Sequence, residues 1–154
     1  MGLEDLLSPS GVICNLKARC KREALQTLAE KAETLVGKPA ADIMSTLLER
    51  EQLGSTGVGD GVAIPHGKIE GLGAITGLLA RLEKPVSFDA VDDQPVDIVF
   101  MLLAPANATA AHLKALAKVS RLLRDRQACD ALRGADSEEA LFAIATRDRK
   151  DYAA

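Results

Sequence analysis

Seven consecutive apolar residues, at positions 98–104, decide which architectures are open to this chain. The run is much shorter than the ~20 apolar residues that a membrane-spanning helix needs. A strand without polar alternation is typical of a sheet that is covered on both faces. The sequence therefore predicts a buried strand over residues 96–104 with a layer of structure on each side.

The remaining segments supply these layers. Helices are predicted where apolar residues recur at a spacing of three and four, over residues 21–36, 40–52, 109–124 and 137–144. Strands are predicted over residues 12–16, 62–64 and 75–82, with an added edge strand at 85–88. The charged tail 147–151 is expected to be a solvated helix end. Interleaved strands and helices predict an α/β sandwich.

Length and composition narrow the class of protein. A chain of 154 residues without an obvious linker predicts one domain over residues 1–154. A formal net charge of −3 argues against nucleic acid as a partner. Only 3% of the residues are aromatic, which argues against a surface on which nucleobases stack and against a carbohydrate site lined by aromatic side chains. The three cysteines are odd in number and lack a C-x-x-C spacing, so we expect reduced thiols. Because the longest apolar run is too short to cross a membrane, we also expect a cytoplasmic protein that is not embedded in one.

A cluster of seven glycines at positions 54–73 invites a nucleotide-binding interpretation, which its spacing does not support. A phosphate-binding loop has four residues between its first glycine and the glycine that precedes its lysine, whereas five residues separate Gly61 from the glycine before Lys68. In addition, Ile69 stands where such a loop needs Ser or Thr. The only two histidines, His66 and His112, are far apart in the sequence and form no metal-binding spacing. We therefore expect neither a cofactor nor a metal.

His66 is the stronger candidate for chemistry. It follows a short apolar strand, Pro65 stiffens the backbone before it, and Gly67 removes side-chain bulk after it. Such an imidazole would be rigid, open on one side and nucleophilic near its ordinary pKa of ~6.5. The alternative at this point is an ordinary loop histidine.

The residues around His66 resemble the enzyme IIA domains of the bacterial phosphoenolpyruvate-dependent phosphotransferase system, in the fructose, mannitol and nitrogen group. That signature consists of an acidic or amide residue, six positions, an apolar and a small residue, two positions, and then apolar-Ala-apolar-Pro-His-small. This sequence satisfies every position with Glu51, Val58, Gly59, Val62, Ala63, Ile64, Pro65, His66 and Gly67. The resemblance extends over essentially the whole chain and implies a mixed β-sheet flanked by helices on both faces, the type-2 enzyme IIA fold.

The resemblance implies a phosphotransferase. The histidine at position 66 would accept a phosphoryl group from the phosphohistidine of a small carrier resembling HPr, with Arg50 and His112 beside it in the active site. A guanidinium can bond two phosphoryl oxygens at once, although Arg50 could also be a solvated cation in the last turn of a helix. His112 would lie in the first turn of a helix just after the buried strand, where it could instead be a histidine packed at the core edge.

Thr56 is a weaker candidate. Its hydroxyl, like that of Ser55, could donate a hydrogen bond to a phosphoryl oxygen, but residues in a Gly-Ser-Thr-Gly turn often only cap the backbone. We therefore place Thr56 after His66, Arg50 and His112 among the expected site residues.

Within the family, the segment 3–9 is most similar to the nitrogen-regulatory branch. That branch implies a nitrogen-type HPr-like carrier as donor, and regulated transporters or sensor kinases as partners that are bound according to the phosphorylation of His66. Two alternatives remain open at this stage. One is a fructose- or mannitol-type enzyme IIA that passes phosphate to a sugar transporter, and the other is a binding module that is not phosphorylated.

Overall fold

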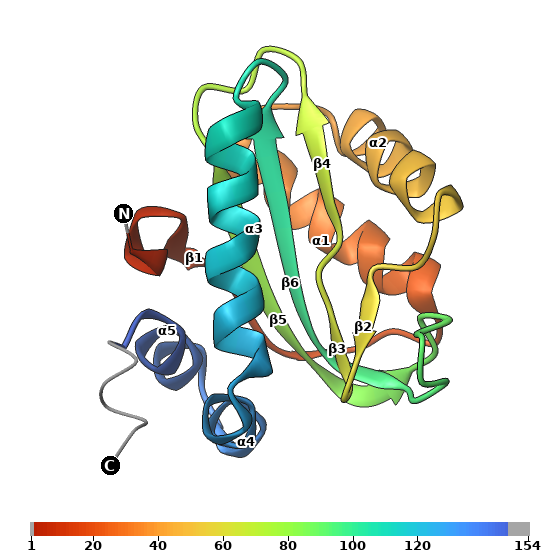
Figure 1. Cartoon of the computed structure of the whole chain (residues 1–154), viewed down its shortest axis with the longest axis vertical. Helices are drawn as coiled ribbons and strands as arrows, with labels where there is room; N and C mark the ends of the chain where they lie inside the picture. Colours follow the sequence, from red (N-terminus) through yellow and green to blue (C-terminus); the bar gives the residue numbers. More distant parts are fainter. Residues whose placement is uncertain (1, 148–154) are drawn as a thin grey trace.

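The strand β6 (Val96–Pro105) lies inside a six-stranded mixed sheet, as its apolar sequence predicts (Figure 1). The computed structural model describes residues 2–147. The sheet order is β1-β5-β6-β3-β2, and β4 also pairs with β6. Besides β6, the strands are β1 (Leu7–Leu16), β2 (Gly57–Gly59), β3 (Val62–Ala63), β4 (His66–Ile69) and β5 (Thr76–Val86).

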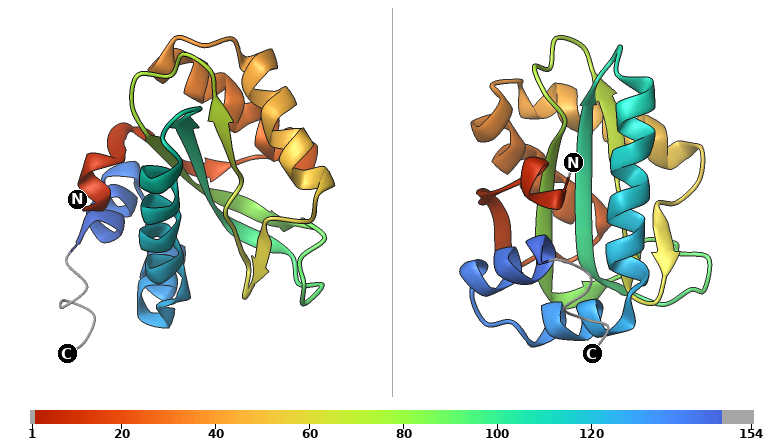
Figure 2. Two further views of the ribbon diagram at one scale, coloured as in Figure 1. Left: turned by 45° about the horizontal axis from the view of Figure 1, so that its top comes forward. Right: turned by 60° about the vertical axis from the view of Figure 1, so that its left-hand side comes forward.

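Two layers of helices cover the sheet. The helices α1 (Lys21–Val36) and α2 (Ala40–Gln52) pack on one face. The opposite face is covered by α3 (Thr109–Arg124), α4 (Arg126–Gly134) and α5 (Glu138–Thr146) (Figures 1 and 2). The predicted mixed sheet with helices on both faces is thus confirmed.

The alternation of side chains along β6 explains why no polar residue interrupts it. Ile98 and Phe100 pack among α3, α4 and α5. Val99, Met101 and Leu103 point to the other side and pack with α1 and α2. All five side chains are at most 1% exposed, so both faces of this strand are core.

One edge of β6 is shared by two short strands that run parallel to it. The strand β3 pairs Val62 with Ile98, and β4 then pairs His66 with Leu102. Between them Pro65 has no N–H to donate, but its carbonyl accepts the N–H of Leu102 at 2.9 Å. The segment that contains the glycine cluster is therefore tied to the central strand on both sides of Pro65.

The helix boundaries follow local signals closely. The helices predicted over residues 21–36, 40–52 and 109–124 have these bounds in the structure. At the end of α1, Gly37 adopts the left-handed conformation with φ 72° and donates its N–H to the carbonyl of Glu33. Ser137 caps α5 by accepting the N–H of Ala140 at 3.1 Å.

The structure departs from the sequence predictions at several elements, and one prediction falls mostly outside the described residues. The helix α4 was not predicted, although Asp125 caps it by accepting the N–H of Ala128. The first strand begins at Leu7 rather than at Val12, and a register shift against β5 lies between these two residues. No separate edge strand exists at residues 85–88, because β5 continues to Val86 and pairs there with Val96. Of the tail 147–151, Arg147 caps α5 and residues 148–151 lie outside the described part.

The two ends of the described chain meet on the α3 side of the sheet. A short 3-10 helix, η1 (Leu3–Asp5), packs beside α5 (Figure 2). Within residues 2–147, no helix combines the length and the apolar character that crossing a membrane requires.

Candidate functional site

His66 is the first residue of β4, immediately after Pro65. Its Nδ1 lies 2.9 Å from the carbonyl oxygen of Ile64. Because a carbonyl oxygen only accepts hydrogen bonds, Nδ1 carries the proton in this contact and Nε2 keeps its lone pair. The backbone thus selects one tautomer of the imidazole.

Arg50 approaches the other imidazole nitrogen from the last turn of α2. Its Nε donates to Nε2 of His66 at 3.3 Å, and its Nη1 donates to the carbonyl of Gly54 at 2.9 Å. The second bond anchors the guanidinium to the turn that follows α2. The remaining N–H groups of Arg50 leave donors for an oxyanion bound at His66.

His112 lies beside His66, in the first turn of α3. The two ring centroids are 5.6 Å apart, and the ring planes are inclined by 48°. His112 is 5% exposed, and its buried Nδ1 has no hydrogen-bond partner among residues 2–147. The other ring nitrogen, Nε2, is therefore the one that this residue could offer to a ligand. The structure brings together His66, Arg50 and His112, the three residues that the family resemblance implies for the site.

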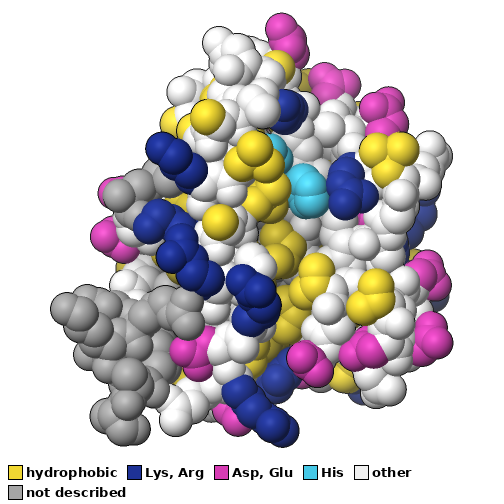
Figure 3. All heavy atoms as spheres, in the orientation of Figure 1, with side chains coloured by type: hydrophobic (Ala, Val, Ile, Leu, Met, Phe, Trp, Pro, Cys, Tyr) yellow, Lys and Arg dark blue, Asp and Glu magenta, His cyan; other side chains and the backbone are white. Residues whose placement is uncertain are grey.

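The histidines line an open hollow of about 430 Å³ between α2, β4 and α3. In Figure 3 the cyan histidine side chains lie in this depression with a dark blue cation beside them. The hollow is lined by Thr46, Glu49, Arg50, Leu53, His66, Gly67, Lys68 and His112. Its opening toward solvent allows a large partner to reach His66.

Lys68 is a site residue that the sequence analysis missed. It lines the hollow, and its Nζ lies 2.8 Å from the hydroxyl of Thr109 at the start of α3. Side chains two positions apart on a strand share a face, so a strand beginning at His66 would have placed Lys68 beside it. The sequence predicts a strand that ends before His66 rather than one that begins there, so it gives no reason to place Lys68 at the site.

Both imidazoles are neutral at neutral pH. Burial lowers the pKa of His66 below its ordinary value of 6.5, and the charge of Arg50 also lowers it, whereas the Ile64 carbonyl and Glu51 raise it. Burial also lowers the pKa of His112, and the positive charges of His66, when it is protonated, and of Lys68 act in the same direction. A neutral imidazole with a free Nε2 is the nucleophilic form.

Thr56 does not reach the hollow. Its side chain is 3% exposed, and its hydroxyl donates to the carboxylate of Glu51. Its backbone N–H donates to the same carboxylate at 3.1 Å. The structure therefore places Thr56 behind the site rather than at its surface.

Glu51 organises the segment behind His66. Its side chain is 6% exposed, and besides Thr56 it contacts Nζ of Lys21 from α1 at 2.6 Å. The carbonyl of Thr56 accepts the N–H of Ile64 at 3.0 Å, and the carbonyl of Ile64 is the group that holds Nδ1 of His66. A chain of hydrogen bonds therefore connects a buried carboxylate on α2 to the orientation of the imidazole.

Gly67 is small for a reason that differs from the one expected. A Cβ atom at this position would lie 2.6 Å from Cγ2 of Thr46. The glycine therefore allows α2 to pack closely on β4, which brings Arg50 to His66. The place that a Cβ atom would take at this position is thus occupied by Thr46.

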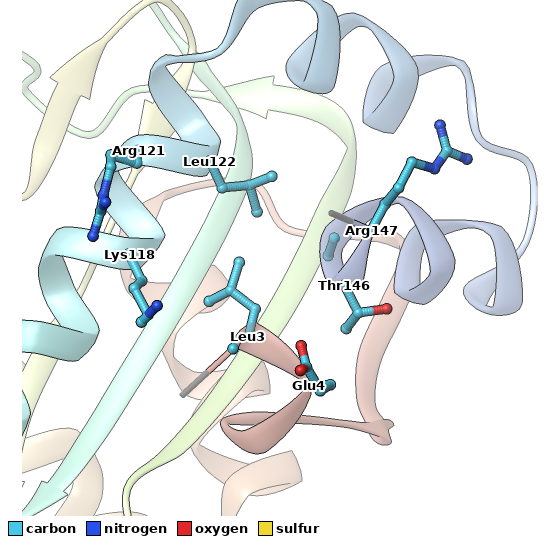
Figure 4. Close-up of a pocket in the computed structure, with 9 residues that line it drawn as sticks. Leu3, Glu4, Lys118, Arg121, Leu122, Thr146 and Arg147 are labelled. Atoms are coloured by element: carbon cyan, nitrogen blue, oxygen red, sulfur yellow. The ribbon is translucent and has the colours of Figure 1, made fainter. Parts of the chain in front are cut away.

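A second cavity, of about 330 Å³, lies between η1, α3 and α5. Figure 4 shows Lys118 and Arg121 of α3 on one side of it and Thr146 of α5 on the other. It contains no histidine or cysteine. Among residues 2–147, no group of three or more His, Cys, Asp or Glu side chains could hold a metal ion.

Comparison with known proteins identifies the family. The model for the phosphoenolpyruvate-dependent sugar phosphotransferase system, EIIA 2, matches residues 5–147. A nitrogen regulatory protein from Bradyrhizobium diazoefficiens is 48% identical over 144 residues, which cover 94% of each chain.

Solved structures agree with this assignment. The crystal structure of nitrogen regulatory protein IIA-Ntr from Neisseria meningitidis matches with a TM-score of 0.88 and 35% identity, covering 94% of this chain and 99% of that one. IIA mannitol from Escherichia coli shares the fold, with a TM-score of 0.74 at 20% identity over 89% of this chain and 96% of that one. The chain therefore belongs to the EIIA 2 family of the phosphoenolpyruvate-dependent sugar phosphotransferase system.

Proposed function

We propose that His66 accepts a phosphoryl group on Nε2 from the phosphohistidine of an HPr-like carrier protein. The observation that carries this proposal is the tautomer, because the Ile64 carbonyl holds the proton on Nδ1 and leaves the Nε2 lone pair for attack. In the transfer, Nε2 attacks phosphorus as the bond from phosphorus to the donor imidazole breaks. The donor ring keeps the electron pair of that bond, so the step needs neither oxidant nor metal.

The residues around Nε2 suit the charge that moves in this step. A transferring phosphoryl group spreads negative charge over three oxygens, and positioned cations and N–H donors stabilise it. Arg50 already lies 3.3 Å from Nε2, and Lys68 lines the same hollow. We assign these two residues and His112 to stabilising the phosphoryl group, and Thr56 to positioning His66 through Glu51.

The phosphorylated and unphosphorylated forms would present different surfaces. A phosphohistidine adds close to two negative charges to a hollow that now contains neutral imidazoles and cations. We propose that the protein acts in the cytoplasm and regulates nitrogen, potassium or carbon metabolism by binding target proteins according to this state. The similarity to a protein named nitrogen regulatory protein, at 48% identity, supports this branch over sugar transport.

Phosphate mapping tests the proposal. The protein is incubated with phosphoenolpyruvate, enzyme I and the carrier, and the modified residue is located by mass spectrometry under conditions that preserve phosphohistidine. We expect one phosphoryl group on His66, none in the variant His66→Ala, and slower labelling of His66 in His112→Ala. Label that persists in His66→Ala would refute the assignment. A protein that is never labelled but still binds its partners would support a binding module instead.

A further inference from the structure

Lys21, the first residue of α1, forms a largely buried ion pair with Glu51 of α2. Its Nζ lies 2.6 Å from Oε1 of Glu51, and the two side chains are 20% and 6% exposed. The same Nζ donates to the carbonyl of Phe88 at 3.5 Å and lies 5.5 Å from the centre of the Phe88 ring. The ammonium is therefore held where α1, the end of α2 and the loop after β5 meet (Figure 1).

Apolar packing already joins α1 to α2 without this pair. Leu25 and Leu28 of α1 are fully buried in one core cluster with Ile43 and Leu47 of α2. Replacing a buried ion pair by apolar residues of similar volume is often neutral or even stabilising. The pair is therefore better explained by the geometry that it imposes on its surroundings than by the stability that it adds.

Both carboxylate oxygens of Glu51 are engaged. Oε1 contacts Lys21 and accepts the N–H of Thr56 at 3.1 Å, and Oε2 accepts the hydroxyl of Thr56. The carbonyl of Thr56 in turn accepts the N–H of Ile64 at 3.0 Å. The carbonyl of Ile64 is the group that contacts Nδ1 of His66 at 2.9 Å. A continuous set of contacts thus leads from the ammonium on α1 to the imidazole.

The charge of Lys21 stands at the beginning of this set. A carboxylate buried as deeply as that of Glu51 requires a counter-charge and hydrogen bonds. Without the ammonium it would turn toward solvent or take up a proton, and either change removes an acceptor from Thr56. The segment before His66 would then be held less firmly, and the preference for a proton on Nδ1 would weaken.

We propose that Lys21 is a positioning residue for phosphoryl transfer, acting through Glu51 to keep the proton of His66 on Nδ1. Lys21 is not among the residues that line the hollow, so its removal should affect the reaction at Nε2 rather than the binding of the donor. For its effect on transfer, this inference rests on the proposed function. Its effect on the tautomer of His66 can be measured without any phosphoryl group.

The test uses two variants of Lys21 and two controls on the same helix. Lys21→Met removes the ammonium and keeps an unbranched side chain, whereas Lys21→Arg keeps a cation. Lys31→Met makes the same substitution ten residues further along α1. Leu28→Ala opens a cavity in the core between α1 and α2, so it lowers stability without removing a charge.

Two quantities are measured on each variant after thermal unfolding has verified that it is folded. Proton–nitrogen-15 correlation NMR of the side chains gives the tautomer of His66, and the spectrum of His66→Ala identifies its signals. Rapid-quench experiments use rising concentrations of the carrier protein, phosphorylated with phosphoenolpyruvate and enzyme I. They separate the maximal rate of transfer from the donor concentration that gives half of this rate.

In Lys21→Met we expect a mixture of the two tautomers and a maximal rate that is lower by about 10-fold to 100-fold, because a small misplacement of a reacting group can cost about 100-fold. The half-saturating donor concentration should stay at the wild-type value. Lys21→Arg should recover most of the rate and the wild-type tautomer. Both controls should show the wild-type tautomer and rate, although Leu28→Ala lowers the unfolding temperature.

A wild-type tautomer or a wild-type maximal rate in Lys21→Met, an equal change in Leu28→Ala, or no recovery in Lys21→Arg would each overturn the inference. If Lys21→Met does not fold, Thr56→Val decides, because it removes the hydroxyl that binds Glu51; an unchanged tautomer in that variant would overturn the inference as well. If the wild-type protein never acquires phosphate on His66, the proposed function fails, while the NMR comparison still decides whether Lys21 positions the imidazole.

Discussion

Arg50 donates a hydrogen bond, across 3.3 Å, to the Nε2 nitrogen of His66. The other nitrogen is occupied by the carbonyl of Ile64 at 2.9 Å. The nucleophile and the group that would stabilise the transferred charge are therefore already aligned before any phosphoryl group arrives. This pairing gives the first prediction.

Replacing Arg50 by Ala should slow phosphotransfer to His66 by about 100-fold to 1,000-fold, the usual effect of removing one charge-stabilising donor from an active site. The variant Arg50→Lys should recover only part of the rate, since an ammonium cannot bond two oxygens in a fixed plane. Rapid-quench measurements of a single transfer provide the rates. The variant Arg22→Ala, on α1, serves as the control and should behave as wild type; a normal rate in Arg50→Ala would remove this residue from the site.

The pH dependence of the acceptor follows from the lowered pKa of His66. Because the neutral imidazole is the nucleophile, the rate of transfer should fall only as the pH drops through the pKa of His66, which lies below 6.5. Nitrogen-15 NMR titration of the imidazoles measures this value directly. A midpoint above 6.5 for His66 would contradict the burial that the structure shows.

The same two histidines should make stability depend on pH. Both His66 and His112 have a lower pKa in the folded protein than the ordinary 6.5, so below pH 6.5 the unfolded chain binds more protons than the folded one. The free energy of unfolding should therefore fall as the pH drops from 6.5 toward the folded-state pKa values. Above pH 6.5 these histidines should have no effect. Denaturant unfolding of the wild type and of His66→Ala/His112→Ala at several pH values isolates this contribution.

Glu51 should matter for stability more than an exposed carboxylate does. The variant Glu51→Gln leaves Lys21 without its counter-charge at a site where the carboxylate is 6% exposed. We expect a loss of about 3 kcal/mol in the free energy of unfolding, which is typical of removing one partner of a buried ion pair. The matched control is Glu23→Gln, which breaks the exposed pair with Arg19 and should leave the stability unchanged. An equal effect in both variants would show that the Glu51 network does not hold α2 in place.

The close packing of α2 on β4 can be tested by a clash and its relief. Gly67→Ala places a Cβ atom 2.6 Å from Cγ2 of Thr46, so it should lower the free energy of unfolding by about 1–3 kcal/mol and slow phosphotransfer. Thr46→Ser removes that methyl group. The double variant Gly67→Ala/Thr46→Ser should therefore regain most of the lost stability and rate, and no recovery would mean that another contact makes the glycine necessary.

The sequence predicted the parts of this structure that depend on local signals. Apolar spacing located α1, α2 and α3, and the unbroken apolar run located β6. The motif itself selected only His66, and the family resemblance added Arg50 and His112, which the fold brings to His66 from helices at the two sides of β4. The helix α4 escaped prediction because it follows α3 after a single residue, Asp125.

Contacts between distant segments could not be read from the sequence. The pairing of Lys21 with Glu51 joins two helices, and nothing in either segment alone indicates it. For the same reason Thr56 was expected at the site surface, whereas the carboxylate of Glu51 holds its hydroxyl inside. The role of Gly67 likewise depends on Thr46, which lies in another element.

The position of the phosphoryl group within the imidazole tests the central claim most directly. After phosphorylation by the carrier, the nitrogen bonded to phosphorus in His66 can be identified by proton–nitrogen-15 correlation NMR of the histidine side chains. The hydrogen bond from Nδ1 to Ile64 and the approach of Arg50 to the other nitrogen predict a bond at Nε2, with His112 unmodified. A phosphoryl group on Nδ1 of His66, or on His112, would contradict the account.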